Sequence, residues 1–126
     1  MKTILRIKFD DIKPFVALGR SEGVAFSKDG GEWYGVYEDG ELIAFYNFLI
    51  MRGGARFRSN YTRTEWRRQG CLSMFINHAK MLCRERGIMR LTAFCTPMSM
   101  GVHLEHGAKR SSDKFIVYEL GEGVVK

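Results

Sequence analysis

The stretch that decides the fold reads Thr62-Arg63-Thr64-Glu65-Trp66-Arg67-Arg68-Gln69-Gly70-Cys71-Leu72-Ser73. It joins a strand-like segment to an amphipathic helix, and a cluster of polar and basic residues with one glycine lies between them. The first turn of a helix carries free backbone N–H groups and the positive end of the helix dipole. A glycine lets an anion approach that backbone closely, and nearby arginines add positive charge. The stretch therefore predicts a phosphate-binding turn at the start of a helix.

The segments on both sides of this stretch have clear patterns. After it, apolar residues recur three and four apart and share one helical face; they are Leu72, Phe75, Ile76, Ala79, Leu82 and Cys83. Gly87 is expected to end this helix. Before it, residues 33–37 and 42–50 flank an Asp-Gly turn, which is typical of a β-hairpin, and residues 56–62 follow as a third strand.

The N-terminal part has weaker patterns. Residues 4–9 alternate in part and are expected to form a strand. Asp10 and Asp11 are expected to cap a short helix that ends near Leu18. Residues 19–31 are polar and are expected to be irregular.

The C-terminal part completes an α+β pattern. Residues 88–95 alternate as a strand, and Thr96-Pro97 has the form of an N-cap followed by proline at the first helical position. This second helix is expected to end near Gly107, and residues 115–120 form the last strand. The predicted fold is therefore α+β, with a mixed central sheet made of an antiparallel meander and at least one parallel crossover, flanked by helices.

Length and composition indicate a single domain over residues 1–126. No apolar run is long enough to span a bilayer, and the charges near the N-terminus do not fit a signal peptide. The cysteines Cys71, Cys83 and Cys95 are odd in number and widely spaced, which argues against a disulfide framework or a zinc site. We therefore expect a cytoplasmic protein without a metal and without a membrane partner.

Charge is unevenly distributed along this chain of net charge +6. Residues 51–90 hold ten basic and two acidic side chains, whereas residues 1–50 hold six basic and eight acidic ones. Residues 91–126 hold four of each. The middle of the chain thus supplies the positive excess, and its partner is expected to be anionic. A solvated basic face is the alternative.

The order of elements around the phosphate turn resembles the GNAT N-acyltransferase superfamily. That family binds acetyl-CoA and moves its acyl group to an amine. Its signature after the fourth strand is Arg/Gln-x-x-Gly-x-Gly/Ala. Arg67 matches the first position and Gly70 the central glycine, while Leu72 departs from the small residue at the last position. Glu65 and Trp66 lie where the family often has Glu-Tyr.

A second landmark of the family is an asparagine after the fifth strand and a helix that ends in a phrase like Leu-Tyr-Glu-Lys-Leu-Gly-Phe. Gly107 matches the glycine of this phrase, His103 takes the place of the tyrosine, and Thr96 takes the place of the asparagine. The resemblance spans about residues 33–120.

The resemblance implies how acetyl-CoA would bind. Backbone N–H groups of the signature turn would hold the pyrophosphate, and the pantetheine arm would pair like an extra strand with the end of the fourth strand. A backbone N–H group there can polarise the thioester carbonyl. The implied cofactor-binding residues are Asn60, Tyr61, Thr62, Arg67, Arg68, Gln69, Gly70, Cys71, Leu72, Ser73 and Thr96.

The resemblance also implies the chemistry: direct transfer of an acetyl group from acetyl-CoA to a primary amine of a small molecule or a protein. The family's tyrosine protonates the leaving thiolate, and His103 could do this because the unperturbed pKa of histidine is about 6.5. An ordinary half-buried histidine is the alternative. No general base stands out; Glu32, Glu41 and Glu65 are candidates by residue type, and a water chain could serve.

Residues 19–32, the turn at 38–41 and the tail after residue 107 are expected to shape the acceptor site. Homodimers are common in this fold and remain open here. Two other functions also remain open. One is a catalytically degenerate protein of the same fold that binds CoA or a partner. The other is a nucleic-acid binder, in which basic residues would hold phosphates and interleaved aromatic residues would stack on bases; these are Arg52, Arg56, Arg58, Arg63, Arg67 and Arg68 with Phe57, Tyr61 and Trp66. Regular strand alternation disfavours this function, because it places Arg56, Arg58 and Asn60 on the face opposite Phe57 and Ser59.

Overall fold

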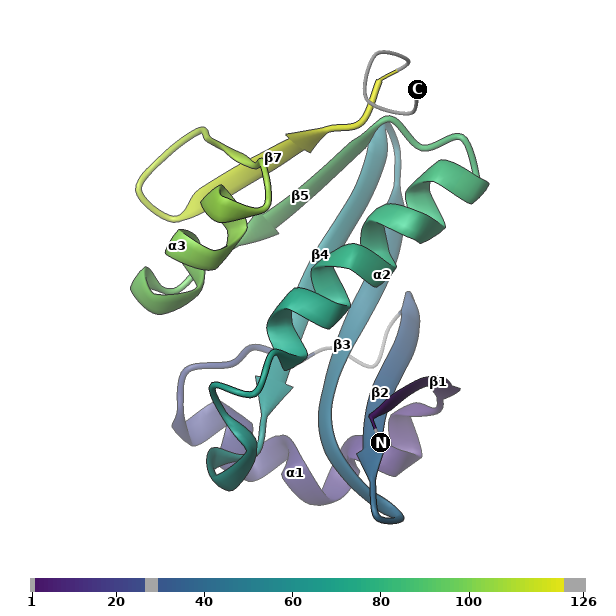
Figure 1. Cartoon of the computed structure of the whole chain (residues 1–126), viewed down its shortest axis with the longest axis vertical. Helices are drawn as coiled ribbons and strands as arrows, with labels where there is room; N and C mark the ends of the chain where they lie inside the picture. The colour runs from purple at the N-terminus through teal and green to yellow at the C-terminus, as the bar shows by residue number, and fades with distance from the viewer. Residues whose placement is uncertain (1, 27–29, 122–126) are drawn as a thin grey trace.

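The computed structural model describes residues 2–26 and 30–121 (Figure 1). Its centre is a seven-stranded sheet in the order β1-β2-β3-β4-β5-β7-β6. The strands are β1 (Thr3–Ile7), β2 (Glu32–Glu38), β3 (Glu41–Met51), β4 (Gly54–Thr62), β5 (Arg90–Phe94), β6 (Lys109–Arg110) and β7 (Phe115–Glu119). Within the described residues, β4 and β5 form the single parallel pair. The predicted α+β fold with a meander and a parallel crossover is confirmed.

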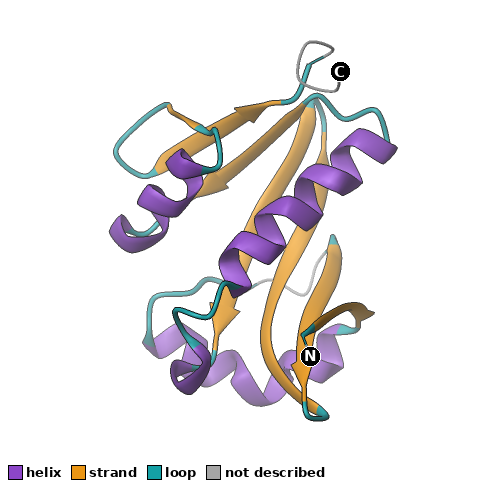
Figure 2. Cartoon of the chain, viewed as in Figure 1, coloured by secondary structure: helices purple, strands orange, loops and turns teal. Residues whose placement is uncertain are grey.

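Helices cover both faces of the sheet (Figure 2). The helix α1 (Phe9–Ser21) lies on one face, while α2 (Cys71–Glu85) and α3 (Pro97–Glu105) lie on the other. A short 3-10 turn, η1 (Thr64–Trp66), precedes α2. None of the helices in the described part of the chain is long and apolar enough to cross a membrane.

The sheet has a separate apolar core on each face. The core under α2 and α3 includes Tyr46, Phe57 and Phe75, and the smaller core under α1 includes Phe45 and Tyr61. The predicted apolar face of α2 is buried, apart from Leu72, which is half-buried against the same core. Burial of this stripe rather than helix propensity fixes α2 in place, because isolated helices of this length are marginal in water.

The start and the end of α1 differ from the prediction. Lys8, not Asp10 or Asp11, is the N-cap, and the Asp11 carboxylate accepts a hydrogen bond from the Lys8 N–H group at 2.9 Å. The helix also continues to Ser21, so the segment predicted to be irregular is shorter. Gly19 lies inside the helix. Its position requires a glycine because a Cβ atom there would come within 2.6 Å of the Phe26 ring. The strand β6 was not predicted, since two residues carry no periodicity.

A β-bulge in β4 corrects the predicted alternation of that strand. Ser59 and Asn60 together stand opposite Tyr46 of β3, and Ser59 has a positive φ of 54°. Phe57 and Tyr61 would share a face in a regular strand, but they pack in opposite cores. One inserted residue reverses the alternation of everything that follows it. The prediction that carried a regular alternation through Asn60 is therefore wrong beyond Arg58.

The bulge lies beside a split in the sheet. β4 and β5 pair only from Ala55 with Leu91 to Phe57 with Ala93. Beyond this point β4 continues with β3, and Figure 1 shows β5 leaving at an angle toward α3. The split exposes the inner edges of two strands in the middle of the molecule.

Candidate active site

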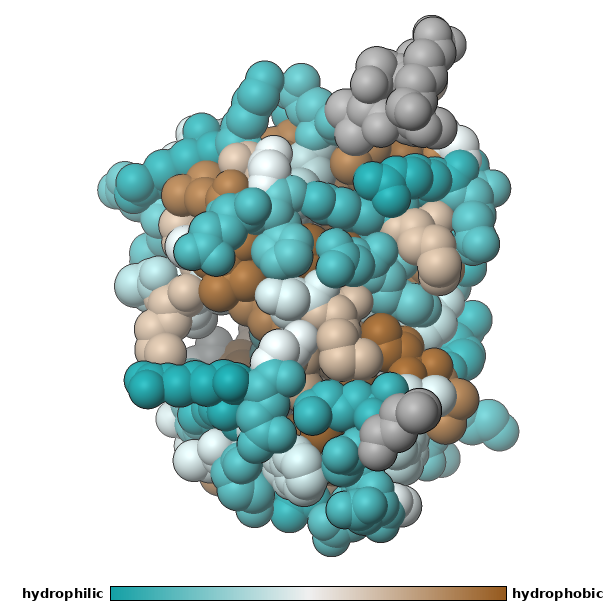
Figure 3. Space-filling view, in the orientation of Figure 1, coloured by the Kyte–Doolittle hydropathy of each residue, from teal (hydrophilic) through white to brown (hydrophobic). Residues whose placement is uncertain are grey.

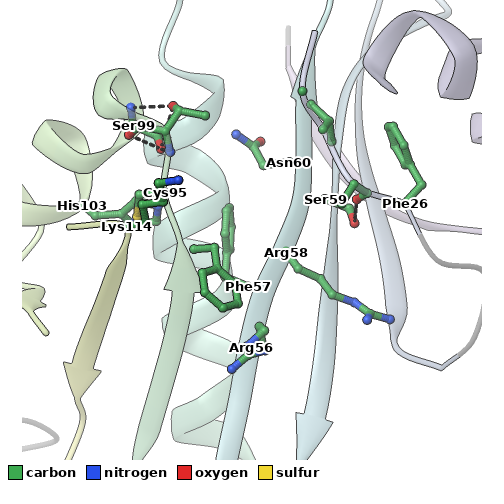
Figure 4. A pocket seen from close by; sticks show the side chains of 15 residues that line it. Phe26, Arg56, Phe57, Arg58, Ser59, Asn60, Cys95, Ser99, His103 and Lys114 are labelled. Carbon is green, nitrogen blue, oxygen red and sulfur yellow. Dashed lines mark hydrogen bonds between the residues drawn. The ribbon is translucent and has the colours of Figure 1, made fainter. Parts of the chain in front are cut away.

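A cavity of about 470 Å³ fills the split between β4 and β5. Figure 3 shows the surface hollowed between α3 and the turn that precedes α2. Four parts of the chain line the cavity: the segment after α1, the middle of β4, the end of β5 with α3, and the residue that precedes β7 (Figure 4). The lining residues are Gly23, Val24, Ala25, Phe26, Arg56, Phe57, Arg58, Ser59, Asn60, Phe94, Cys95, Thr96, Ser99, His103 and Lys114.

The turn before α2 presents backbone donors. Arg68 and Gly70 have positive φ angles of 64° and 83°, which turn the chain sharply into the helix. The N–H group of Arg67 bonds to Thr64, and the next backbone bond is from Met74 to Gly70 at 3.0 Å. Among the described residues, the N–H groups between these two have no backbone acceptor. The first turn of α2 also lacks an acidic residue, so its positive end is available to an anion.

Arg67 turns away from this row of N–H groups. Its Nε atom donates to the Thr62 carbonyl at 2.9 Å, and its Nη2 atom donates to the Glu22 carboxylate. Its guanidinium also lies 5.6 Å from the centre of the Tyr61 ring, and the Tyr61 hydroxyl donates to Glu22 at 3.1 Å. The hydrogen bond from Arg67 lowers the pKa of Glu22. Arg67 therefore ties the turn to the end of α1.

Asn60 and Thr96 face the cavity from opposite sides. The Asn60 side chain points from β4 toward the side that carries Ser99 and Cys95 (Figure 4). Its Oδ1 atom is buried and has no hydrogen-bond partner among the described residues. Thr96 caps α3, with its Oγ1 atom accepting from the Ser99 N–H group at 3.2 Å. A buried acceptor without a donor is costly, so the Asn60 amide is a natural partner for a ligand N–H group.

His103 lies on α3 at the cavity wall and is only 2% exposed. Its Nδ1 atom lies 2.7 Å from the Tyr118 hydroxyl, and its ring contacts Phe57 edge to face at 5.6 Å. Burial lowers the pKa of His103 to about 4, and the nearby His106 and Lys80 act in the same direction. His103 is therefore neutral near pH 7. Burial also raises the pKa of Tyr118, which stays a hydroxyl.

The other predicted cofactor residues have different surroundings. Arg68, Gln69 and Gly70 are exposed, whereas Cys71 is buried in the core under α2. The Ser73 hydroxyl lies 3.0 Å from Nε2 of His106, which ties the start of α2 to the end of α3. The structure thus gathers Asn60, Thr96 and His103 around one cavity, whereas Tyr61, Thr62 and residues 67–73 are not among the described lining residues.

The three glutamates named as candidate bases do not line the cavity. Glu32 receives two hydrogen bonds from Arg86, which lower its pKa to about 2. Glu41 is exposed at the start of β3, and Glu65 is exposed with its carboxylate 3.4 Å from the Arg63 guanidinium. The described lining residues include no aspartate or glutamate. In the described part of the chain, no group of three or more metal-ligand side chains occurs.

The segments expected to shape the acceptor site differ in position. Residues 23–26 line the cavity, as does Lys114 from the C-terminal segment. The turn at 38–41 does not line it. Residues 27–29 and 122–126 lie outside the described residues.

Sequence reasoning missed several lining residues. The sequence predicts Arg56 and Phe57 only as parts of a nucleic-acid surface, and it indicates no functional role for Phe94. Phe57 and Tyr61 are 3% and 2% exposed, so they are not available to stack on bases. The interleaved basic and aromatic pattern of β4 was the available signal. The sequence does not indicate that these residues line a cavity, because that depends on how β5 and β7 lie relative to β4 in the sheet.

A mixed sheet that splits between its two parallel strands, beside a helix start with unpaired N–H groups, defines the acyltransferase type of α+β fold. The sequence model of the acetyltransferase (GNAT) family matches residues 5–107, so the chain belongs to this family. No sequence among curated proteins matches the chain.

Solved structures with this fold include several acetyltransferases. The ribosomal-protein-S18-alanine N-acetyltransferase from Escherichia coli superposes with a TM-score of 0.81 at 13% identity, covering 97% of each chain. The IAA acetyltransferase from Bacillus cereus gives 0.80 at 15% identity, covering 95% of this chain and 100% of the other. The PaiA N-acetyltransferase from Thermoplasma acidophilum, in complex with coenzyme A, gives 0.76 at 14%, covering 94% and 99%. These similarities show the fold.

Proposed function

We propose that this protein is an N-acetyltransferase that moves the acetyl group of acetyl-CoA to a primary amine by direct attack. The observation that carries the proposal is the row of unpaired N–H groups from Arg68 to Ser73 beside the split between β4 and β5. A pyrophosphate at these N–H groups would place the pantetheine arm along the free edge of β4. Membership of the acetyltransferase family and the coenzyme A complex of the PaiA structure support this reading.

Three features of the cavity fit the arm and its thioester. The unpartnered Asn60 Oδ1 atom would accept a hydrogen bond from a pantetheine amide. The bulge at Ser59 breaks the ladder, so that a backbone N–H group of β4 can point at the thioester carbonyl. Leu72 is half-buried against the core, so it does not stand between the N–H groups and an anion.

In the proposed reaction, the acetyl group passes directly from sulfur to the amine nitrogen. The amine nitrogen attacks the carbonyl carbon, the C–S bond breaks, the amine loses a proton, and the thiolate gains one. His103 would serve the departing sulfur as a hydrogen-bond donor. The single proton of the Tyr118 hydroxyl has two acceptors within reach, Nδ1 of His103 at 2.7 Å and the His103 carbonyl oxygen at 3.3 Å. The shorter contact favours donation to Nδ1, which leaves the ring proton on Nε2, where it can be donated to sulfur. The acetyl group ends on the amine, and coenzyme A leaves as the thiol.

Calorimetric titration with acetyl-CoA and, separately, with CoA tests the cofactor site. Release of free thiol in the presence of an amine panel tests transfer. We expect micromolar binding of both ligands, and thiol release that depends on an amine. Binding without thiol release for any amine would favour the degenerate alternative, and no binding up to millimolar concentration would overturn the cofactor site. The proposal keeps a cytoplasmic location, with which the three buried free thiols are consistent.

A further inference from the structure

We infer that the amine acceptor carries an anionic group, such as a carboxylate, next to an apolar body, and that Arg56 binds that group. The inference rests on the proposed function and names the acceptor class for the same cavity. Its basis is the charge of the lining. Arg56, Arg58 and Lys114 all line the cavity, and the described lining residues contain no carboxylate.

Among the residues that the structure describes, Arg56 contacts two aromatic rings and a hydroxyl group rather than a carboxylate. Its guanidinium lies 5.0 Å from the centre of the Phe94 ring and 5.3 Å from that of Phe115. Its Nε atom contacts the Thr92 hydroxyl at 3.4 Å. Among the described residues, no carboxylate pairs with it. A planar guanidinium fixed on two rings retains donors suited to a bidentate bond with an acid group.

The position of Arg56 assigns it to the acceptor rather than to acetyl-CoA. Its neighbour Phe57 faces the core under α2, so Arg56 faces the opposite side of the sheet. The unpaired N–H groups of the phosphate turn lie at the start of α2, on the other face. A cofactor that enters from the α2 side thus meets an acceptor that enters from the Arg56 side, with the split between them.

The other two cations add charge but are placed differently. Arg58 Nε donates to the Asn47 amide oxygen at 2.8 Å, and its Nη2 atom reaches the Gly30 carbonyl at 3.4 Å, so its guanidinium is fixed against β3. Lys114 lies on the far side of the cavity, where its carbonyl accepts from the Cys95 N–H group at 2.7 Å. Its exposed ammonium can reach an anion held by Arg56 only through a long, mobile side chain.

The charge of the lining also bears on how the amine loses its proton. Positive groups nearby disfavour an ammonium and lower its pKa, so the acceptor binds more readily as the attacking neutral amine. This reduces the need for a general base, which the described lining does not provide. A polyamine would bring further positive charge into the same cavity and is disfavoured.

The apolar part of the acceptor is indicated by exposed aromatic surface. Phe94 is 67% exposed at the cavity rim, and Phe26 reaches the cavity from the segment after α1. Phe94 also packs on Phe115 with their ring centres 4.7 Å apart. The exposed Phe94 ring, supported by the half-buried Phe115 and lying beside an arginine, suits an amino acid with an apolar or aromatic side chain.

Matched acceptor pairs test the inference. Each pair differs only in the acid group: phenylalanine with 2-phenylethylamine, tryptophan with tryptamine, and leucine with 3-methylbutylamine. We expect kcat/KM to be at least roughly tenfold higher for the acid-bearing member, as one charge-assisted hydrogen bond predicts. In Arg56→Gln this preference should fall by a similar factor, with the KM for acetyl-CoA unchanged. Arg52→Gln, in the exposed β3–β4 turn, is the matched control.

A binding measurement keeps the inference separate from turnover. In CoA-saturated protein, N-acetylphenylalanine should bind at least roughly tenfold more tightly than N-acetyl-2-phenylethylamine, and Arg56→Gln should abolish the difference. Equal affinities, or a preference that survives in Arg56→Gln, would overturn the inference even if transfer occurs. Absence of turnover with every amine, while CoA and the acetylated acid bind as expected, would instead overturn the proposed function alone.

Discussion

The two ends of the cavity are built in opposite ways. Apart from the Asn60 amide, the proposed cofactor end uses backbone groups of one short stretch, residues 60–73, at the end of β4 and the start of α2. The proposed acceptor end uses side chains from four segments that are far apart in the sequence. Backbone N–H groups belong to every residue, so the cofactor end depends on conformation. The acceptor end depends on which side chains the fold brings together.

The difference shows in the arginines. Arg67 lies at the cofactor end, but its guanidinium is engaged with Glu22 and the Thr62 carbonyl. Arg56 lies at the acceptor end and rests on two aromatic rings. Two arginines that look alike in the sequence thus have different tasks: the first shapes a backbone turn, and the second presents charge to a ligand.

We expect the largest effect on CoA binding from a substitution that blocks the backbone N–H groups at the cofactor end. Gly70→Asp places a carboxylate at the unpaired N–H groups, so CoA should bind roughly 100-fold more weakly, the equivalent of about two charge-assisted hydrogen bonds. Gly53→Asp is a matched control, because Gly53 and Gly70 have φ angles of 88° and 83° and open space at Cβ. Titration calorimetry of both variants compares them. An equal loss in the two would show that backbone strain, not the anion site, is responsible.

The next effect concerns the buried histidine between the two ends. The pKa of His103 is about 4 in the fold and returns to its ordinary value near 6.5 on unfolding. As the pH falls, His103 is therefore protonated in the unfolded chain before it is protonated in the folded one. Its contribution to the free energy of unfolding is fully present above pH 6.5 and is lost as the pH falls toward 4. The loss is at most about 3 kcal/mol. Denaturant titrations between pH 7 and 4.5 should show this slope in the wild type and a smaller one in His103→Gln. The same slope in both would contradict the assignment.

A substitution at Asn60 should have a smaller effect, and it should change CoA affinity and folding stability in opposite directions. Asn60→Leu removes a buried, unpartnered acceptor, so the free protein should gain about 1 kcal/mol of unfolding free energy. CoA should bind roughly tenfold more weakly, because the pantetheine amide loses its partner. Chemical denaturation and calorimetry measure the two quantities. Asn77→Leu on the exposed face of α2 serves as the control, and a destabilised Asn60→Leu would refute this role.

The smallest effect tests whether arginine charge matters at the cofactor end. Arg67→Gln and Glu22→Gln should each weaken CoA binding only severalfold, because exposed ion pairs contribute little and the N–H groups remain. The double variant should be no weaker than Arg67→Gln alone, since that variant already removes the contact with Glu22. A loss in Arg67→Gln as large as that in Gly70→Asp would mean that Arg67 contacts the phosphates directly.

Helices and strands could be predicted from the sequence where the local pattern of apolar and turn residues agreed with their environment in the fold. The β2–β3 hairpin follows from an Asp-Gly turn, and the buried face of α2 follows from its periodicity. The predicted α1 ended too early because the polar segment from Gly19 was expected to be irregular, whereas Gly19 lies inside the helix and makes room for the Phe26 ring. The bulge at Ser59 gave no signal, because a serine with positive φ looks like any other serine.

By itself, the sequence determined the α+β order of elements, the phosphate-type turn at Gly70 and the likeness to the acetyltransferase family. These depend on neighbours within a few residues, where capping, periodicity and turn chemistry act. Only the tertiary structure decided that β4 and β5 separate after Phe57, that His103 is buried and neutral beside Tyr118, and that Arg56 meets Phe94 and Phe115. Those relations join residues up to about half the chain apart, and packing of the whole sheet fixes them.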